Sequence, residues 1–236
     1  MIKVENIEVW GFEHALRGMR NPLNSWNRSD SYFTYFEDSE TMQTAKLEFF
    51  AGENDLYLMR RLYKAGAEHR KFLRQIFVSM DIIAPRFWFL EFDTYKIGTV
   101  SNSCSTMHTI MKKEFTLEDF SFDSSLPWAG DDCIALVEDL NHIREIYLLP
   151  ESEYEELCES VGFKDNEIPP KETVWRALIE LLPQSYNQRR TVTMNYENVF
   201  NMIHQRENHK LSEWRYFTDI LKNLPYVKEI AGNDEK

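Results

Sequence analysis

The chain has 236 residues, of which 43% are hydrophobic and 14% aromatic, and its formal net charge is −12. This length suits one large domain or two small ones, with ample material for a packed core. An acidic surface repels phosphate polymers, so we expect no long nucleic acid as a partner. Three cysteines without a CxxC pair argue against a disulfide framework. The absence of an apolar run of about 18 residues argues against a membrane protein. We therefore expect a cytoplasmic, globular protein of mixed α/β class.

Aromatic and amphipathic segments predict the first elements. Residues 32–36 (Tyr-Phe-Thr-Tyr-Phe) are typical of a strand. A helix is expected next, with Asn54 or Asp55 as its N-cap and Gly66 at its end.

The segment 74–82 alternates in polarity. Ile76, Val78, Met80 and Ile82 fall on one side, which favours a strand, although the same segment would also form a helical face. Ala84-Pro85 then resembles the start of a buried apolar helix.

The second half contains one hydroxyl-rich segment and one clear helix. Residues 98–108 are small and polar, and we expect them to form a loop. The stretch 165–170 is a polar break, too short to divide the single domain expected over 1–236. Asn195 is a good N-cap for a helix whose apolar face also carries Arg206.

Several side chains are candidates for chemistry, each with a structural alternative. The hydroxyls and amide within 101–108 could donate to a phosphate or ribose, or cap their own backbone. Arg206, drawn toward an apolar face, needs an anionic partner, which could be a carboxylate of the chain or a ligand phosphate. Glu91 with Asp93 could serve acid–base work or hold Arg86.

The histidines give no metal site. Six are scattered along the chain, and His204 and His209 are five residues apart, which does not align them on one helical face. His69 stands alone after a glycine turn, where a histidine is usually structural or solvated. We therefore expect no metal.

The C-terminal pattern resembles that of the flavin-dependent thymidylate synthase family. Leu182-Pro183, Asn195 and Arg206 have the spacing of the family's C-terminal signature, in which an Asn-capped helix ends in a substrate-binding arginine. Gly66-Ala67-Glu68-His69 is similar to its glycine turn and FEH element. The family's RHR triplet is replaced by Leu90-Glu91-Phe92, and its NExSxR element survives only as Asn102-Ser103-Cys104-Ser105-Thr106-Met107.

This resemblance implies a fold and an activity. The fold would be a mixed β-sheet flanked by helices, assembled as a homotetramer. The enzyme would be a methyltransferase in which FAD moves a one-carbon unit from methylenetetrahydrofolate to dUMP, with NADPH as hydride donor. The implied site residues follow by role: Arg206 and His69 for catalysis; Ser105, Arg206, Asn102 and Ser103 for substrate; His69, Asn195, Arg86 and Glu91 for the cofactor.

Two other functions remain open. The lost RHR triplet favours the same fold working without flavin, as a nucleotide-binding or altered pyrimidine-modifying protein. A non-enzymatic interaction domain would instead expose large aromatics without a polar cleft.

Overall fold

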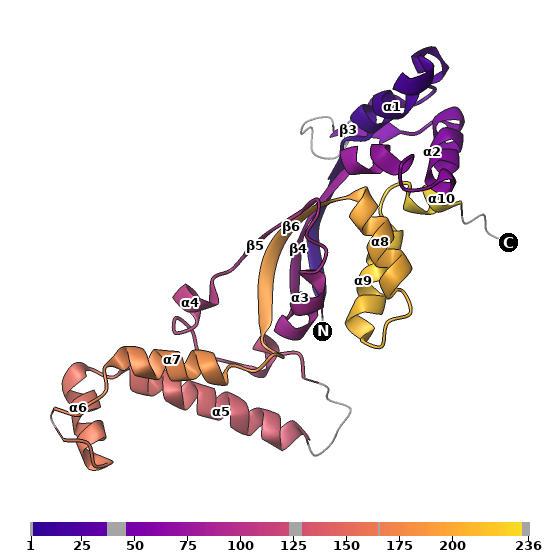
Figure 1. Cartoon of the computed structure of the whole chain (residues 1–236). Helices are drawn as coiled ribbons and strands as arrows, with labels where there is room; N and C mark the ends of the chain where they lie inside the picture. Colours follow the sequence, from indigo (N-terminus) through magenta and orange to yellow (C-terminus); the bar gives the residue numbers. More distant parts are fainter. Residues whose placement is uncertain (1, 37–45, 123–128, 165, 233–236) are drawn as a thin grey trace. The chain divides into compact units, whose positions relative to one another are not determined.

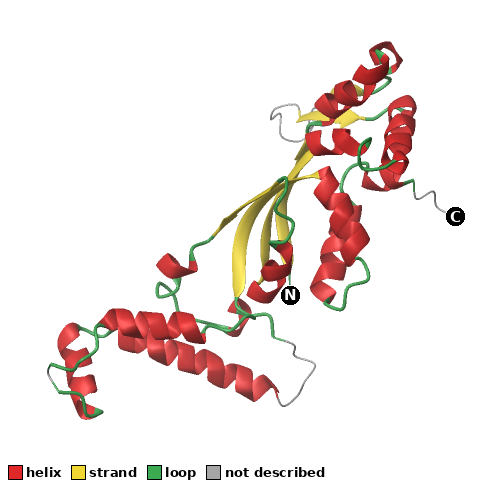
Figure 2. Cartoon of the chain, in the orientation of Figure 1, coloured by secondary structure: helices red, strands yellow, loops and turns green. Residues whose placement is uncertain are grey.

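The computed structural model describes residues 2–36, 46–122, 129–164 and 166–232, and it has the predicted mixed α/β architecture (Figures 1 and 2). A four-stranded sheet has the order β1-β4-β6-β5, and a separate two-stranded sheet pairs β2 with β3. The strands of the larger sheet are β1 (Lys3–Trp10), β4 (Phe77–Pro85), β5 (Thr99–Ser103) and β6 (Asn187–Asn195).

The chain divides into two compact units. The terminal unit comprises Val4–Asp81, Asp93–Ser101 and Thr191–Lys236, and the middle unit comprises Met1–Lys3, Ile82–Phe92 and Asn102–Arg190. The polar break expected at 165–170 is not a border between them, although residue 165 itself lies outside the described residues.

The terminal unit holds an antiparallel hairpin and five α-helices among its described residues. Tyr32 pairs with Phe50 and Phe36 with Lys46 in the hairpin. Its elements are α1 (Phe12–Arg20), η1 (Asn21–Leu23), η2 (Trp26–Arg28), β2 (Tyr32–Phe36), β3 (Lys46–Phe50), α2 (Glu53–Ala65), η3 (Arg70–Gln75), α8 (Tyr196–Arg206), α9 (Ser212–Lys222) and α10 (Val227–Ala231).

Strand β4 has the two-sided pattern that its sequence predicts. Val78, Met80 and Ile82 are each no more than 1% exposed, while the residues between them are partly exposed. Successive side chains of a strand point to opposite faces, so the apolar set is packed into the core. The strand interpretation is therefore confirmed for residues 77–82, whereas residues 74 and 75 end η3 (Arg70–Gln75).

The partly exposed side of β4 carries polar pairs. Asp81 accepts hydrogen bonds from Asn6 at 2.9 Å and from Thr191 at 2.6 Å, which ties three strands together across this face. Thr193 donates to Ser79 at 3.2 Å on the same strands. These side-chain pairs support the register of the sheet.

The middle unit is built mainly from helices. Its elements are α3 (Arg86–Phe92), α4 (Thr106–Thr109), η4 (Leu117–Asp119), α5 (Ala129–Leu148), α6 (Glu151–Ser160) and α7 (Lys171–Leu181). Helices α5 and α7 lie side by side (Figure 1). Leu140 and Leu178 are at most 1% exposed and belong to one core cluster, which also includes Phe115 and Phe120.

The starts of two helices differ from what the sequence predicts. Helix α2 begins at Glu53 after the N-cap Gly52, so neither Asn54 nor Asp55 caps it. Asp30, distant in sequence, accepts hydrogen bonds from the backbone nitrogens of Asn54 at 3.0 Å and Asp55 at 3.2 Å. A partner outside the helix thus satisfies these terminal N–H groups, and local sequence cannot reveal it.

The second difference concerns Pro85 alone, since the apolar helix expected after it is present. It is the last residue of β4, and the apolar helix α3 begins one residue later, at Arg86. Proline lacks the N–H of an interior strand residue, which suits the end of a strand as well as the start of a helix.

Candidate functional site

Helix α8 places Arg206 at its C-terminal end. Its N-cap is Asn195, whose Oδ1 accepts a hydrogen bond from the backbone nitrogen of Asn198 at 3.1 Å, as the sequence predicts. Val199 and Met202 are fully buried, which fixes the rotation of the helix about its axis. The cap and the apolar face therefore determine where the side chain of Arg206 emerges.

Arg206 lies against two aromatic rings. Its Nε donates to Tyr95 Oη at 3.0 Å, and its guanidinium carbon is 5.0 Å from the centroid of the Trp214 ring and 5.8 Å from that of Tyr95. Tyr95 in turn donates to Gln205 at 2.9 Å. We call Tyr95, Gln205, Arg206 and Trp214 the Arg206 cluster.

Aromatic contacts suit an arginine that binds an anion. The faces of these rings attract the positively charged guanidinium and hold it in place. The planar guanidinium can donate to a phosphate through two N–H groups at once. The cluster thus has the chemistry of an oxyanion-binding site.

Sequence reasoning missed Tyr95. This residue lies in the connection from α3 to β5, and no motif marks it. Its role depends on a contact with Arg206, which is 111 positions away in the sequence. Trp214 lies on α9, the helix that follows Arg206 in the sequence, and it is fully buried there.

Asn195 and Asn198 support the turn that follows Tyr95. Asn198 Nδ2 donates to the carbonyl of Ile97 at 2.6 Å and to Thr99 Oγ1 at 2.8 Å, and the backbone nitrogen of Asn195 donates to the carbonyl of Gly98 at 3.1 Å. Gly98 has φ +75°, and a Cβ there would meet Asn195 Nδ2 at 2.1 Å. The polar groups of Asn195 therefore support this turn and the start of α8.

The hydroxyl-rich segment is more ordered than expected. Asn102 and Ser103 end strand β5 and are exposed, and Ser105 is the N-cap of the four-residue helix α4. The Ser105 side chain makes no capping hydrogen bond, while its carbonyl accepts from Thr109 Oγ1 at 2.7 Å. The expectation of a loop over 98–108 was wrong because β5 pairs with β6 here, as the 2.9 Å hydrogen bond from Cys104 to Arg189 illustrates.

The remaining predicted residues are distributed over both units. His69, in the terminal unit, precedes η3, and its side chain is 51% exposed, 3.7 Å from the carboxylate of Glu68. Arg86 and Glu91 are partly exposed on α3 in the middle unit, together with the segment 102–105. The structure brings Arg206 and Asn195 onto one helix of the terminal unit.

The triplet that stands in place of RHR has a simple structural role. Leu90 is 64% exposed and Phe92 is 1% exposed. Phe92 stacks on Trp88 with their ring centroids 5.1 Å apart. An apolar residue at this position therefore completes the aromatic face of α3, and Leu90-Glu91-Phe92 carries no cation.

In the described parts of the chain, no group of three or more His, Cys, Asp or Glu side chains is arranged to hold a metal ion. Among these same residues, no helix has the length and apolar character needed to cross a bilayer.

The fold resembles that of solved structures of thymidylate synthase ThyX. Thymidylate Synthase X (ThyX) from Helicobacter pylori with FAD and dUMP has a TM-score of 0.65 and 16% identity, and the match covers 99% of this chain and 98% of that one. A second structure, of flavin dependent thymidylate synthase ThyX from Helicobacter pylori complexed with FAD and dUMP, has a TM-score of 0.64 and 16% identity, with 98% of each chain covered. No protein-family model and no curated protein matches the sequence. At this identity the likeness establishes the fold, over nearly the whole chain.

Proposed function

We propose that this chain binds a dUMP-like pyrimidine nucleotide and that Arg206 contacts the nucleotide's phosphate. The observation that carries the proposal is the position of Arg206, at the end of an Asn-capped helix and against Tyr95 and Trp214. A guanidinium in aromatic surroundings is partly shielded from water, which strengthens its interaction with a phosphate. The ThyX-like fold supports the choice of a pyrimidine nucleotide, since the H. pylori proteins were crystallised with dUMP.

Other polar side chains offer hydrogen-bond donors to a nucleotide. We assign Ser105, Asn102 and Ser103 to the substrate because they offer hydroxyl and amide donors and are at least partly exposed. His69 would be the second catalytic residue, since an imidazole can move a proton near neutral pH.

We propose that the enzyme is flavin-dependent. FAD carries a diphosphate, which needs cations or N–H donors around it. Arg86 offers a partly exposed guanidinium, and His69 a half-exposed imidazole with N–H donors; each is a residue type that binds anionic groups. Glu91 would accept hydrogen bonds from hydroxyl or N–H groups of the cofactor. Asn195 would contribute indirectly, by capping the start of α8. When bound, FAD would supply the electrons and carry the one-carbon unit, with methylenetetrahydrofolate and NADPH as co-substrates.

A second function rests on the triplet Leu90-Glu91-Phe92. Because these residues provide no positive charge and Phe92 is buried, they cannot replace the charges of the RHR triplet. The same fold would then bind a pyrimidine nucleotide without flavin, or would modify it by another reaction.

One purification separates the two functions. Bound flavin gives a yellow protein with visible absorbance, as the first function requires. A colourless protein that dUMP stabilises in a melting assay would support the second, because a ligand that binds only the folded state raises the melting temperature. A colourless protein that does not respond to dUMP, even after incubation with FAD, would contradict both.

We also propose that the chain assembles as a homotetramer in the cytoplasm, as its resemblance to the family implies. Light scattering on the purified protein tests the assembly. A mass close to four times 28.2 kDa supports it, and a monomeric mass contradicts it.

A further inference from the structure

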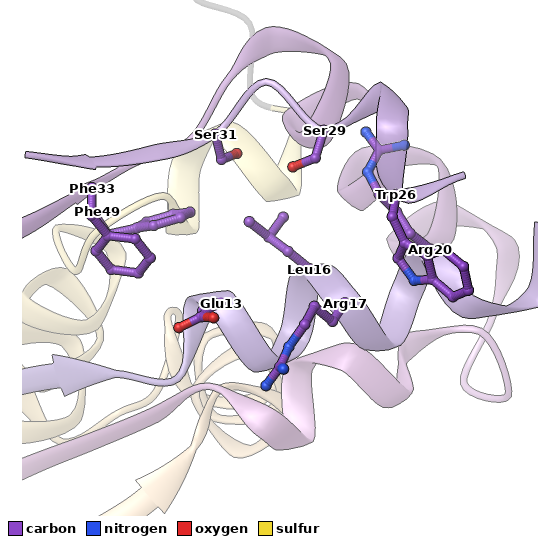
Figure 3. A pocket seen from close by; sticks show the side chains of 9 residues that line it. All are labelled: Glu13, Leu16, Arg17, Arg20, Trp26, Ser29, Ser31, Phe33 and Phe49. Carbon is purple, nitrogen blue, oxygen red and sulfur yellow. The ribbon is translucent and has the colours of Figure 1, made fainter. Parts of the chain in front are cut away.

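The terminal unit contains a second candidate binding site, a cavity of about 330 Å³ lined by α1, η2 and the β2–β3 hairpin (Figure 3). Pockets for small organic molecules have volumes of roughly 300–1,000 Å³. None of its lining residues belongs to the Arg206 cluster. This cavity would therefore be a separate site.

The polar wall of the cavity is held in place by the buried side chain of Asp55. Arg20 lines the cavity, is 4% exposed and donates to Asp55 Oδ1 at 2.6 Å. Ser29 and Ser31, on the same wall, donate to Asp55 Oδ2 at 2.7 and 2.6 Å. These groups already have partners, so the wall is preformed and adds little hydrogen-bonding capacity for a ligand.

Aromatic rings form the other walls, and they too are anchored. Phe49 stacks on Phe12 with centroids 4.9 Å apart and planes at 2°, and it lies 5.3 Å from Phe33. Trp26 Nε1 donates to Asn21 Oδ1 at 2.9 Å, while 51% of this tryptophan stays exposed. Exposed but fixed ring faces bind a planar or apolar body with little loss of conformational entropy.

Glu13 and Arg17 give the cavity its charge pattern. Both are exposed side chains on α1, four residues apart, so they are neighbours about 6 Å apart along the helix. No ion pair joins them, and neither forms one with another side chain in the part of the chain that the structure describes. Figure 3 shows both beside Leu16 at the cavity. The cavity is thus lined by one anionic and one cationic side chain.

We infer that this cavity binds a small aromatic zwitterion of the aromatic amino-acid class. The guanidinium of Arg17 binds the ligand's carboxylate, and the carboxylate of Glu13 binds the ligand's ammonium group. The ligand's aromatic ring packs against Trp26 and Phe33. A ligand with only a carboxylate would be repelled by Glu13, and one with only an ammonium group would be repelled by Arg17. The charge pattern therefore selects a ligand that carries both groups.

Three probes that share an indole ring test this inference by isothermal titration calorimetry: L-tryptophan, indole-3-propionate without the ammonium group, and tryptamine without the carboxylate. L-Tryptophan should bind the wild-type protein best. Arg17→Gln and Glu13→Gln should each lower the affinity for L-tryptophan about tenfold, which is the effect expected from losing one hydrogen bond to a charged group. Glu13→Gln should at the same time improve binding of indole-3-propionate, and Arg17→Gln should improve binding of tryptamine.

The controls are Arg61→Gln and Glu53→Gln, which remove the same charges from exposed positions on α2. These should leave all three affinities unchanged, as should Arg206→Ala. The inference is overturned if L-tryptophan does not bind, or if the variants of Arg17 and Glu13 bind it as the controls do. The inference is also overturned if both variants bind all three probes more weakly by the same factor, because charge would then not select the ligand.

Discussion

Arg20 and Asp55 form a buried ion pair that joins helix α1 to helix α2. Arg20 Nε and Asp55 Oδ1 are 2.6 Å apart, and the two side chains are 5% and 0% exposed. The remaining N–H groups of Arg20 reach the carbonyls of Ser25 and Arg28 at 3.1 Å. The pair therefore fixes the segment between η1 and β2 as well as the two helices.

Replacing Asp55 by Asn should destabilise the protein by about 3–5 kcal/mol, because it leaves the Arg20 charge buried without its counter-charge. The free energy of unfolding from urea titration measures this cost. Asp219→Asn is the matched control, since Asp219 is 71% exposed at the side chain and its loss should change stability by less than about 0.5 kcal/mol. Equal effects of the two substitutions would mean that the pair contributes little.

The same carboxylate predicts a pH dependence. Burial alone would raise the pKa of Asp55, but hydrogen bonds from Ser31, Ser29 and Arg20 together hold this pKa below its usual value. A lowered folded-state pKa contributes stability above the unfolded pKa of about 3.9, and this contribution is lost as pH falls through the folded pKa. The stability gap between wild type and Asp55→Asn should therefore be constant from about pH 5 to 7 and shrink below about pH 4. A gap that stays constant down to pH 3 would contradict the assignment.

Gly98 should not tolerate a side chain. In Gly98→Ala the new Cβ would lie 2.1 Å from Asn195 Nδ2, and the φ of +75° is itself strained for alanine. We expect a loss of about 1–3 kcal/mol, the usual cost of such a conformation, together with weaker dUMP binding because the turn follows Tyr95. Gly130→Ala is the control, since nothing lies within 4 Å of a Cβ there. Thermal denaturation of both variants compares them, and equal melting temperatures would contradict the role given to this turn.

Local signals in the sequence were sufficient for the start of α8, and they favoured the strand over the helix at β4. Asn195 caps α8 through its own first turn, and the alternation of Val78, Met80 and Ile82 follows directly from the period of a strand. These features need no knowledge of distant residues.

Features that depend on distant contacts were missed. Asp55 has the local pattern of an N-cap, but Arg20, 35 positions away, together with Ser29 and Ser31, holds its carboxylate inside the core. The contact of Tyr95 with Arg206 and the cavity beside the β2–β3 hairpin are likewise made by residues far apart in sequence. Pattern reasoning on one sequence cannot pair such residues, so it found Arg206 without its aromatic neighbours.

Tyr95→Phe tests whether the hydroxyl of Tyr95 positions the side chain of Arg206. The change removes the hydroxyl that accepts from Arg206 Nε and donates to Gln205, while it keeps the ring. One net hydrogen bond is worth about 1 kcal/mol, so dUMP should bind about fivefold more weakly. Tyr57→Phe, at a tyrosine that is 60% exposed on α2, should bind dUMP as the wild type does. If Tyr95→Phe also binds normally, Tyr95 does not position Arg206.

Calorimetric titration of dUMP into wild type, Arg206→Ala, Arg206→Lys and the surface control Arg61→Ala tests the proposed function most directly. Loss of a charge-assisted hydrogen bond costs about 1.5–3 kcal/mol, so Arg206→Ala should raise the Kd at least about tenfold. Arg206→Lys should fall between Arg206→Ala and wild type, and Arg61→Ala should match wild type. If Arg206→Ala keeps its fold and binds dUMP with the wild-type Kd, or if the wild type does not bind dUMP, Arg206 is not the phosphate-binding residue that the proposal requires.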